Sequence, residues 1–489
     1  MLSKPSLALL ALAALTTQTA LAQLPTGVRQ ALRQAQVPPQ AISVLVQPLD
    51  ADTSPARLLH RENEPMNPAS VMKLFTTYAG LQLLGPDHVW HTRVYTTGPV
   101  HEGVLQGSLV VQGSGDPKLV VERAQALVAD IQAQGVRQVR GDIVLDRSVF
   151  DVAPRSEPFD DEPLRPYNAT PDGLLLNFKS VIYRFSPDAT GTRASVTSEP
   201  PLAGLQVPAE VPLKAGPCND WRSDLRADFG QPLRTVFAGA YPASCGQRYW
   251  PVAFPAPDEF APRMLQALWT QGGGQLSGQV RMGSTPAQAR LLLEHRSLPL
   301  REVIADINKM SNNVMAQQLF LTLSAEMGAP GRFEASRLRL TRWWRERFPG
   351  QFTPVLDNGS GLSRSERSTA AALGQLLQQA ARGPEADTFR QSLAIAGVDG
   401  TVQRMKERMP QSPLLGRAWL KTGSLRDVAS VAGYVQGESG KRYSVVAIIN
   451  HPNAGQARAA LDQLLDWTAR DLGAPEPIRQ KRRPHHAVR

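Results

Sequence analysis

Ser70 and Lys73 are the residues of this chain whose types and spacing point most directly to chemistry. They stand three positions apart in the segment NPASVMKLFTTYAG (67–80), and residues at i and i+3 share one face of a helix. A serine hydroxyl attacks a carbonyl when a base takes its proton, and a lysine beside apolar side chains can be that base because desolvation lowers its pKa. The pair therefore indicates acyl transfer, although an exposed surface pair is the simpler interpretation of this motif by itself.

Two further motifs favour acyl transfer over an exposed surface pair. The segment SNN (311–313) is the only S-x-N of the chain, and KTG (421–423) is the only K-[ST]-G. They follow SVMK (70–73), the only S-x-x-K, in the order that penicillin-binding proteins and serine β-lactamases use. Each motif occurs once and the three follow this order, so a chance match explains them poorly.

The segment around Ser70 has the sequence of a helix start. Asn67 is a favourable N-cap residue, and Pro68 suits the first helical position. A helix start supplies free N–H groups and a dipole, which favour the negative charge that develops on an attacked carbonyl. The apolar residues that recur at helical spacing, and that we expect on the buried face beside Lys73, are Val71, Leu74, Phe75 and Tyr78.

The middle of the chain differs in sequence pattern from its N- and C-terminal parts. Residues 93–280 contain short β-like runs with glycine-rich turns. One core domain interrupted by inserted modules explains this arrangement more economically than separate N- and C-terminal domains. The elements expected in the core are a strand over 41–49 with a hairpin partner in 57–63, one long helix or two consecutive helices over 300–328, and antiparallel strands over 417–425, 428–437 and 442–450.

With these motifs in place, the sequence resembles the D-alanyl-D-alanine carboxypeptidase/endopeptidase group of low-molecular-mass (class C) penicillin-binding proteins. Ser70 and Ser311 are 241 positions apart, whereas these motifs lie much closer in a compact β-lactamase-like domain. The resembled group carries large inserted domains at that point. The segments that carry the resemblance are MNPASVMKL (66–74), GSGDPKL (113–119), MSNNVMAQQL (310–319), DNGSGLSR (357–364), AGVDGT (396–401), KTGSL (421–425) and INHPNA (449–454).

The resemblance implies an α/β (α+β) fold. Its core is a β-lactamase/transpeptidase-like antiparallel sheet with flanking helices, interrupted by inserted β-rich domains. The expected division of the chain is a signal peptide (1–22), a first core part (23–92), inserted modules (93–280) with a nested subdomain near 185–260, a second core part (281–475) and a basic disordered tail (476–489).

The resemblance also implies a serine-type D-alanyl-D-alanine carboxypeptidase and endopeptidase that acts on peptidoglycan stem peptides and cross-links. Ser70 would form the acyl-enzyme, and Lys73 would take the proton of its hydroxyl. Ser311 would relay a proton to the leaving amine with the help of Lys421. Asn313 would hydrogen-bond the peptide amide and keep Lys73 in place.

Further residues follow from the same resemblance. Thr422 and Ser424 would bind the terminal carboxylate on either side of Gly423, and the backbone N–H groups of Ser70 and Ser424 would form the oxyanion hole. Arg364 in DNGSGLSR would line the site, although a structural turn explains that segment equally well. Neither a cofactor nor a metal is needed, and β-lactam antibiotics would act as covalent inhibitors.

Two other functions remain open. A serine β-lactamase shares the acylation but adds rapid deacylation, and the long insert argues against its compact form. A catalytically weak cell-wall binding or sensing protein could keep the same fold, but the intact motifs argue against it. Rival catalytic signals are poor, because the chain has no G-x-S-x-G, and His88 and His91 lack the H-E-x-x-H pattern of a zinc site.

The first residues are typical of a secretion signal. Lys4 precedes an apolar run (7–15), and a small-residue site predicts cleavage after Ala22, with an uncleaved anchor as the alternative. We therefore expect an exported, periplasmic protein. Cys218 and Cys245 are the only cysteines, and they predict one disulfide in an oxidising compartment or two free buried thiols.

The net charge of +10 is unevenly distributed. The tail after Glu476 has no apolar periodicity, so we expect it to be disordered, with at most a peripheral attachment to an anionic wall polymer or membrane. Its basic residues have no interleaved aromatic side chains, and this argues against nucleic-acid binding. Five of the ten charges come from Arg479, Lys481, Arg482, Arg483 and Arg489.

Overall fold

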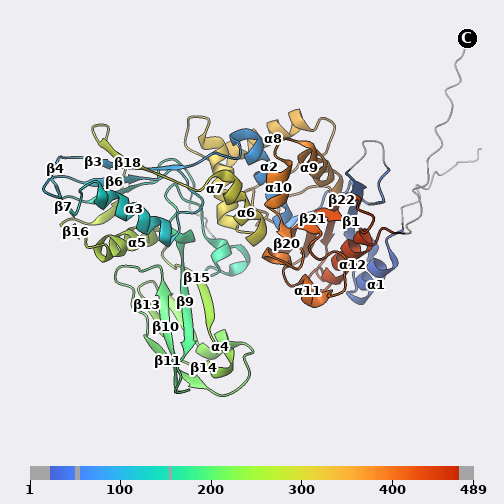
Figure 1. The fold of residues 1–489 in the computed structure, drawn as a ribbon, viewed down its shortest axis with the longest axis horizontal. Coiled ribbons are helices and arrows are strands. Elements are labelled where there is room, and N and C mark those ends of the chain that lie inside the picture. Colours follow the sequence, from blue (N-terminus) through green and yellow to red (C-terminus); the bar gives the residue numbers. More distant parts are fainter. Residues whose placement is uncertain (1–22, 50–54, 154–156, 473–489) are drawn as a thin grey trace, which may run out of the picture.

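A six-stranded antiparallel sheet joins the two ends of the chain in the computed structural model, which describes residues 23–49, 55–153 and 157–472 (Figure 1). β1 (Ile42–Pro48) pairs with its expected hairpin partner β2 (Leu58–His60) on one side and with β22 (Arg442–Asn450) on the other. The sheet continues through β21 (Val428–Gln436) and β20 (Ala418–Leu425) to β19 (Ala394–Ile395). The expected core, assembled from both chain ends, is therefore present.

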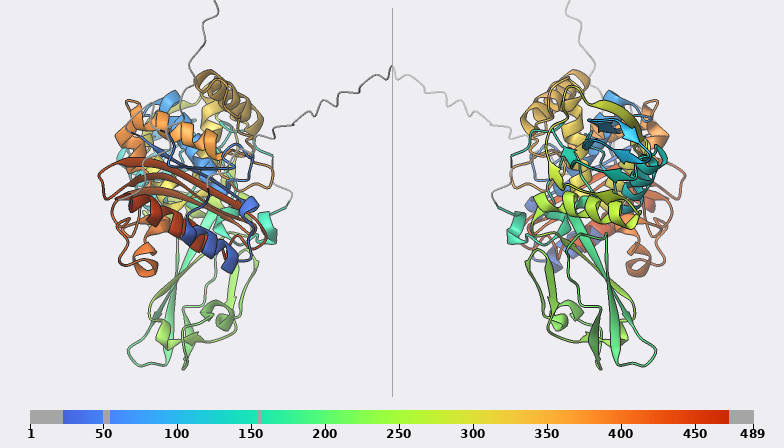
Figure 2. Two further views of the ribbon diagram at one scale, coloured as in Figure 1. Left: turned by 90° about the vertical axis from the view of Figure 1, so that its right-hand side faces the viewer. Right: turned by 90° about the vertical axis from the view of Figure 1, so that its left-hand side faces the viewer.

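Both faces of this sheet are covered, and this explains the unbroken apolar run of β22. Val445 and Ala447 pack into a cluster with the terminal helices, whereas Val446 and Ile448 pack on the opposite face. Figure 2 shows the sheet between its two helical layers. The first layer contains α1 (Thr26–Gln34), α11 (Met405–Arg408) and α12 (Arg458–Ala469), and the second contains α2 (Lys73–Leu84), α6 (Leu300–Met310), α7 (Asn313–Ala325), α8 (Phe333–Arg347), α9 (Ala370–Arg382) and α10 (Ala386–Gln391).

The inserted part begins at β3 (His91–Thr96) and returns to the core after β18 (Arg290–Arg296), which pairs with β3. This part therefore extends past the expected boundary at residue 280, because β18 belongs to its sheet. The sheet order is β17-β8-β6-β3-β18, beside a smaller sheet β16-β7-β5-β4. Its other elements are β4 (Val100–His101), β5 (Val104–Leu105), β6 (Leu109–Gln112), α3 (Val121–Ala133), β7 (Gln138–Val139), β8 (Ile143–Asp146), α5 (Pro257–Gln271), β16 (Gln275–Leu276) and β17 (Val280–Met282).

A third sheet is nested inside this insertion and projects away from it in Figure 1. Its order is β14-β11-β10-β9-β15, and the ribbon β12-β13 lies beside it. A disulfide joins Cys218 to Cys245 at one end of this module. Its elements are β9 (Ser180–Pro187), β10 (Arg193–Glu199), β11 (Glu210–Lys214), α4 (Trp221–Leu225), β12 (Ala227–Gln231), β13 (Arg234–Phe237), β14 (Tyr241–Pro242) and β15 (Arg248–Ala253).

The helix expected to begin near Ser70 is divided in two. Residues Ala69–Met72 form a 3₁₀ turn, and α2 begins only at Lys73. Ala69 has φ +46°, a left-handed conformation that a regular α-helix does not contain. The N-cap position of this turn is occupied by Pro68 and not by Asn67 as expected, although Oδ1 of Asn67 accepts the N–H of Ala69 at 2.8 Å just before the turn. α2 is buried around most of its circumference rather than on one face, and Thr76 and Thr77 are as enclosed as Phe75.

The helical segment 300–328 also consists of two helices. α6 ends at Met310, and Ser311 takes a left-handed conformation with φ +57°. Asn312 then caps α7, because its Oδ1 accepts the N–H of Met315 at 3.1 Å. The break places the side chains of Ser311 and Asn313 at the junction of two helices.

The expected signal peptide (1–22) and basic tail (476–489) lie outside the described residues. Within the described residues, no helix is both long and apolar enough to cross a membrane.

Candidate active site

Ser70 lies on the 3₁₀ turn where two glycines bring other segments against its backbone. A Cβ on Gly423 of β20 would stand 2.6 Å from the carbonyl oxygen of Pro68 and 3.0 Å from the nitrogen of Ser70. A Cβ on Gly361 would stand 2.7 Å from the nitrogen of Ser70 and would collide with the carbonyl oxygen of Ala69. Both positions require glycine because only a residue without a side chain allows this approach.

Lys73 is fully buried, and its Nζ contacts three oxygen atoms. It lies 2.9 Å from Oγ of Ser70, 2.6 Å from Oδ1 of Asn313, and within hydrogen-bond distance of the carbonyl oxygen of Ser360. The amide of Asn313 is oriented by its own Nδ2, which donates to the carbonyl oxygen of Tyr167 at 3.3 Å. Asn313 and Ser360 can therefore only accept hydrogen bonds from Lys73.

These two fixed acceptors determine what a neutral Lys73 can do. A neutral amine has two N–H groups and one lone pair, and the two N–H groups are taken by Asn313 and Ser360. The lone pair then faces Ser70, whose hydroxyl becomes the donor. In this geometry a neutral Lys73 can accept the Ser70 proton.

The electrostatic setting favours that neutral form. Burial lowers the pKa of Lys73 well below the ordinary value for lysine, and the nearby charge of Lys421 lowers it further. The carboxyl of Glu366 acts in the opposite direction. Burial and a cationic neighbour are the two conditions under which a lysine serves as a base near neutral pH.

A second lysine–serine pair faces this one. Nζ of Lys421 on β20 donates to Oγ of Ser311 at 2.8 Å and to the carbonyl oxygen of Thr422 at 2.8 Å. Lys421 has no exposed surface, and burial lowers its pKa to about 7. A lysine with this pKa can both carry charge and exchange a proton through Ser311.

The remaining residues of the KTG strand are held by partners that the sequence analysis did not identify. Oγ1 of Thr422 lies 2.8 Å from Oγ1 of Thr401, and Oγ of Ser424 accepts a hydrogen bond from Nη2 of Arg458 at 2.7 Å. Arg458 begins α12 and carries no recognisable motif, so only the fold reveals its position. A cation and two hydroxyl groups at one strand edge form a suitable site for a carboxylate.

Arg364 lies beside the site but does not join the motif residues. Its hydrogen bonds go to Asp160 in the insertion and to Asp427 in the turn after β20, and its guanidinium lies over the ring of Phe159. Lys118, from the segment GSGDPKL, pairs with Asp306 on α6. Both residues tie the inserted part to the core.

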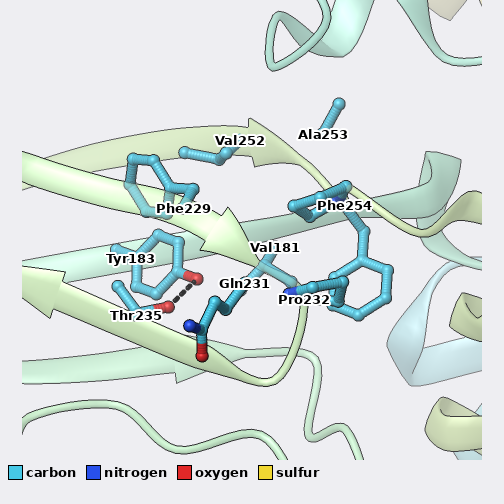
Figure 3. A pocket seen from close by; sticks show the side chains of 10 residues that line it. Val181, Tyr183, Phe229, Gln231, Pro232, Thr235, Val252, Ala253 and Phe254 are labelled. Carbon is cyan, nitrogen blue, oxygen red and sulfur yellow. Dashed lines mark hydrogen bonds between the residues drawn. The ribbon is translucent and has the colours of Figure 1, made fainter.

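A groove of about 740 Å³ lies between the core and the inserted part. Its core side is formed by the junction from Met310 to Val314, and its other side includes Tyr167 and Ile182. A much smaller hollow of about 10 Å³ lies in the nested sheet, where the hydroxyl of Tyr183 meets that of Thr235 at 2.7 Å (Figure 3). That hollow is large enough for about one water molecule, whereas the groove is lined by Ser311 and Asn313 of the S-x-N motif.

Metal-binding groups are not part of this arrangement. Across the ranges that the structure describes, no group of three or more His, Cys, Asp and Glu side chains could hold a metal ion.

Comparisons with known proteins agree with the geometry. A D-alanyl-D-alanine carboxypeptidase of Actinomadura sp. is 31% identical over 449 residues, which cover 86% of this chain and 80% of that protein. The crystal structure of penicillin-binding protein 4 of Haemophilus influenzae matches with a TM-score of 0.72 and 23% identity, covering 90% of this chain and 99% of that one. A structure of the same protein in complex with a β-lactam matches with a TM-score of 0.67 and 22% identity, covering 90% and 100%.

The match to a protein family extends over nearly all of the described chain. Residues 24–471 match the family described as D-Ala-D-Ala carboxypeptidase 3 (S13). This range contains the S-x-x-K, S-x-N and K-T-G motifs and also the inserted part between them. With this match over residues 24–471, and with a relative that is 31% identical, the chain belongs to the D-Ala-D-Ala carboxypeptidase 3 (S13) family of serine peptidases.

Proposed function

We propose that this protein cleaves D-alanyl-D-alanine bonds of peptidoglycan peptides through an acyl-enzyme on Ser70. The observation that carries this proposal is the position of Lys73, whose two fixed acceptors leave its lone pair for the Ser70 hydroxyl. Lys73 takes the hydroxyl proton while Oγ of Ser70 forms a bond to the carbonyl carbon. The C–N bond then breaks, and water later releases the acyl group from Ser70.

The leaving amine needs a proton when the C–N bond breaks. Ser311 is placed to deliver it, because its hydroxyl is held by Lys421 at 2.8 Å and Lys421 has a pKa of about 7. The attack leaves one extra proton on Lys73 and removes one from Lys421, so transfer of that proton from Lys73 to Lys421 restores both groups. When water later releases the acyl group, its hydroxyl goes to the acyl carbon and its other proton goes to Oγ of Ser70. Release of D-alanine from a stem-peptide end is carboxypeptidase activity, and the same step on a cross-link is endopeptidase activity.

The strand edge of β20 supports the assignment of the other roles. Thr422 and Ser424, with Arg458 behind Ser424, are suited to bind the terminal carboxylate of the substrate. The close approach of Gly423 to the nitrogen of Ser70 brings β20 to the position where the N–H groups of Ser70 and Ser424 can bind one oxyanion.

The same proposal includes the partners and the location. Peptidoglycan peptides are the substrates, and β-lactams are covalent inhibitors, as the β-lactam complex of the Haemophilus influenzae relative suggests. The N-terminal sequence suggests export to the periplasm after cleavage at Ala22. The basic residues after Glu476 add a peripheral attachment to the wall or membrane.

The experiment that tests this proposal is the intact mass of the purified protein after incubation with benzylpenicillin, followed by peptide mapping. We expect a persistent adduct on the peptide that contains Ser70, and D-alanine release from a peptide that ends in D-Ala-D-Ala. An unmodified protein beside hydrolysed antibiotic would indicate a β-lactamase instead. An unmodified protein beside intact antibiotic would reject Ser70 as the nucleophile.

A further inference from the structure

Glu366 is a fully buried carboxyl that the mechanism above does not use. It lies two positions after the glycine-rich segment DNGSGLSR (357–364), and its Oε1 accepts three consecutive backbone N–H groups. The donors are Asp357 at 3.0 Å, Asn358 at 3.2 Å and Gly359 at 3.1 Å. One carboxyl oxygen therefore fixes the conformation of the whole turn before Ser360.

This turn is the part of the chain that holds Lys73 from outside its own helix. Ser360 follows directly after the clamped residues, and its carbonyl oxygen accepts from Nζ of Lys73. The carbonyl oxygen of Gly359 accepts from Oγ1 of Thr76 on α2 at 2.6 Å. The turn is thus joined to α2 at both residues. Glu366 reaches Ser360 through Asn358, whose N–H it accepts and whose Oδ1 accepts the N–H of Ser360 at 3.0 Å.

A second observation singles out the carboxyl of Glu366. Its other oxygen, Oε2, is buried and has no hydrogen-bond partner among the described residues. Burial, together with the nearby carboxylate of Asp357, raises the pKa of Glu366 to about 7, and the three backbone N–H groups oppose this rise. Arg337 pairs with Asp357 at the surface of the turn. Buried acids with strongly shifted pKa values cluster at functional sites, so we infer a role for Glu366 beyond packing.

The charged groups around Lys73 connect this acid to the reaction. The charge of Lys421 on β20 lowers the pKa of Lys73, and the charge of Glu366, which holds the clamped turn, raises it. The two neighbours act in opposite directions, because a positive charge favours the neutral amine and a negative charge favours the ammonium. Two interacting groups of this kind lose their protons in coupled steps.

We propose that Glu366 is a positioning residue for the reaction at Ser70: it clamps the Asp357–Gly359 backbone so that the Ser360 carbonyl holds Lys73, and its charge is coupled to the proton on Lys73. The inference rests on the proposed function, because it assigns Lys73 as the base. Glu366 touches neither the substrate nor Ser70, and it acts only through the turn and its charge.

Two substitutions separate the two parts of this role. Glu366→Gln keeps a carbonyl oxygen for the three N–H groups but removes the charge, whereas Glu366→Ala removes both. The measurement is the second-order rate of acylation by benzylpenicillin between pH 5 and 9, together with a thermal unfolding curve. Glu334→Gln on α8, where the side chain is exposed, is a matched charge control.

We expect the acid limb of the Glu366→Gln profile to move to lower pH by about half a unit and to become steeper, because Lys73 then titrates without a coupled acid. The plateau rate should stay within about threefold of the wild type. For Glu366→Ala we expect a plateau rate at least about tenfold lower, since the turn loses its clamp. Glu334→Gln should reproduce the wild-type profile.

The possible results distinguish this inference from the proposed function. If wild-type Ser70 is acylated but the Glu366→Gln profile keeps the wild-type midpoint and steepness, the coupling of charge to proton is wrong. If folded Glu366→Ala keeps the wild-type plateau, the clamp does not position Lys73. A wild-type protein that is not acylated at all would instead reject the proposed function.

Discussion

Nζ of Lys73 lies 2.6 Å from Oδ1 of Asn313, although 240 positions separate these residues in the chain. The contact joins the start of α2 to the start of α7, so the base is held by an element that follows the whole insertion. Asn313 is itself oriented by the carbonyl oxygen of Tyr167, which belongs to the inserted part. The insertion therefore takes part in fixing the position of Lys73.

Asn313→Asp should weaken Lys73 as a base while it keeps the size of the side chain, although it loses the hydrogen bond to the carbonyl oxygen of Tyr167. A carboxylate at this position favours the ammonium form and raises the pKa of Lys73 by about 1–3 units. Because the active base is the neutral amine, the acid limb of the acylation profile should move to higher pH. The rate at neutral pH should fall by about 10-fold or more, as measured with benzylpenicillin.

The adjacent residue offers a matched control for this variant. Asn312→Asp introduces the same charge, but its side chain caps α7 by accepting from Met315, which an aspartate also does. We expect this control to keep the wild-type midpoint of the profile. A wild-type midpoint in Asn313→Asp would contradict the assigned role of Lys73.

Lys421→Met should make the protein more stable near neutral pH. The folded-state pKa of Lys421 is about 7, below its ordinary value of 10.5, because the side chain is buried. Between these two pKa values the unfolded chain therefore binds more protons than the folded protein. The contribution of Lys421 to the free energy of unfolding is thus fully present above pH 10.5 and is lost as the pH falls toward about 7. Methionine does not titrate, so this loss disappears in the variant.

The measurement is urea unfolding of wild type and Lys421→Met at pH 7 and pH 10. The advantage of the variant should be larger at pH 7, by on the order of a few kcal/mol. Lys441→Met, at an exposed position, is the control and should show no such difference between the two pH values. Equal pH dependence in wild type and Lys421→Met would show that Lys421 titrates normally in the folded state.

Gly361→Ala should abolish acylation by displacing the nucleophile. Gly361 has φ +81°, and a Cβ there would collide with the carbonyl oxygen of Ala69 and stand 2.7 Å from the nitrogen of Ser70. The backbone around Ser70 or the turn must move, and a displacement of about 1 Å can cost about 100-fold in rate. We also expect a loss of stability of about 1–3 kcal/mol from the strained conformation.

Gly455→Ala is the matched control for this substitution. It lies in an exposed turn, and a Cβ there would meet nothing within 4 Å. Labelling with benzylpenicillin and thermal unfolding should both give wild-type values. Full labelling of Gly361→Ala would mean that the nucleophile tolerates movement of the turn.

The sequence predicts the parts of this molecule that depend on local patterns. The alternation of Val445, Val446 and Ala447 between two buried faces is visible as an apolar run, and the three motifs identify the side chains of the site. Their elements follow from periodicity, because strands and helices differ in the spacing of apolar residues. The family assignment depends on these features.

Other parts depend on contacts between distant segments and leave no local signal. Ser360 and Tyr167 act through backbone carbonyl oxygens, which any residue type carries. The helical spacing continues across Ser311, so only its left-handed backbone separates α6 from α7. The insertion ends only after β18, because β18 pairs with β3. No sequence pattern near the expected boundary at residue 280 indicates this pairing.

The basic tail leads to a prediction that separates binding from catalysis. Residues 479–489 carry five positive charges and lie outside the described residues. Deleting them should leave benzylpenicillin labelling and D-alanine release from a soluble peptide unchanged, because the motifs and the groove remain intact. At low salt, where charges act over about 30 Å, the shortened protein should bind isolated sacculi more weakly than the wild type. At about 0.15 M salt, screening reduces this range to about 8 Å, and the two proteins should bind nearly equally. Equal retention of both proteins on sacculi at low salt would contradict the proposed attachment.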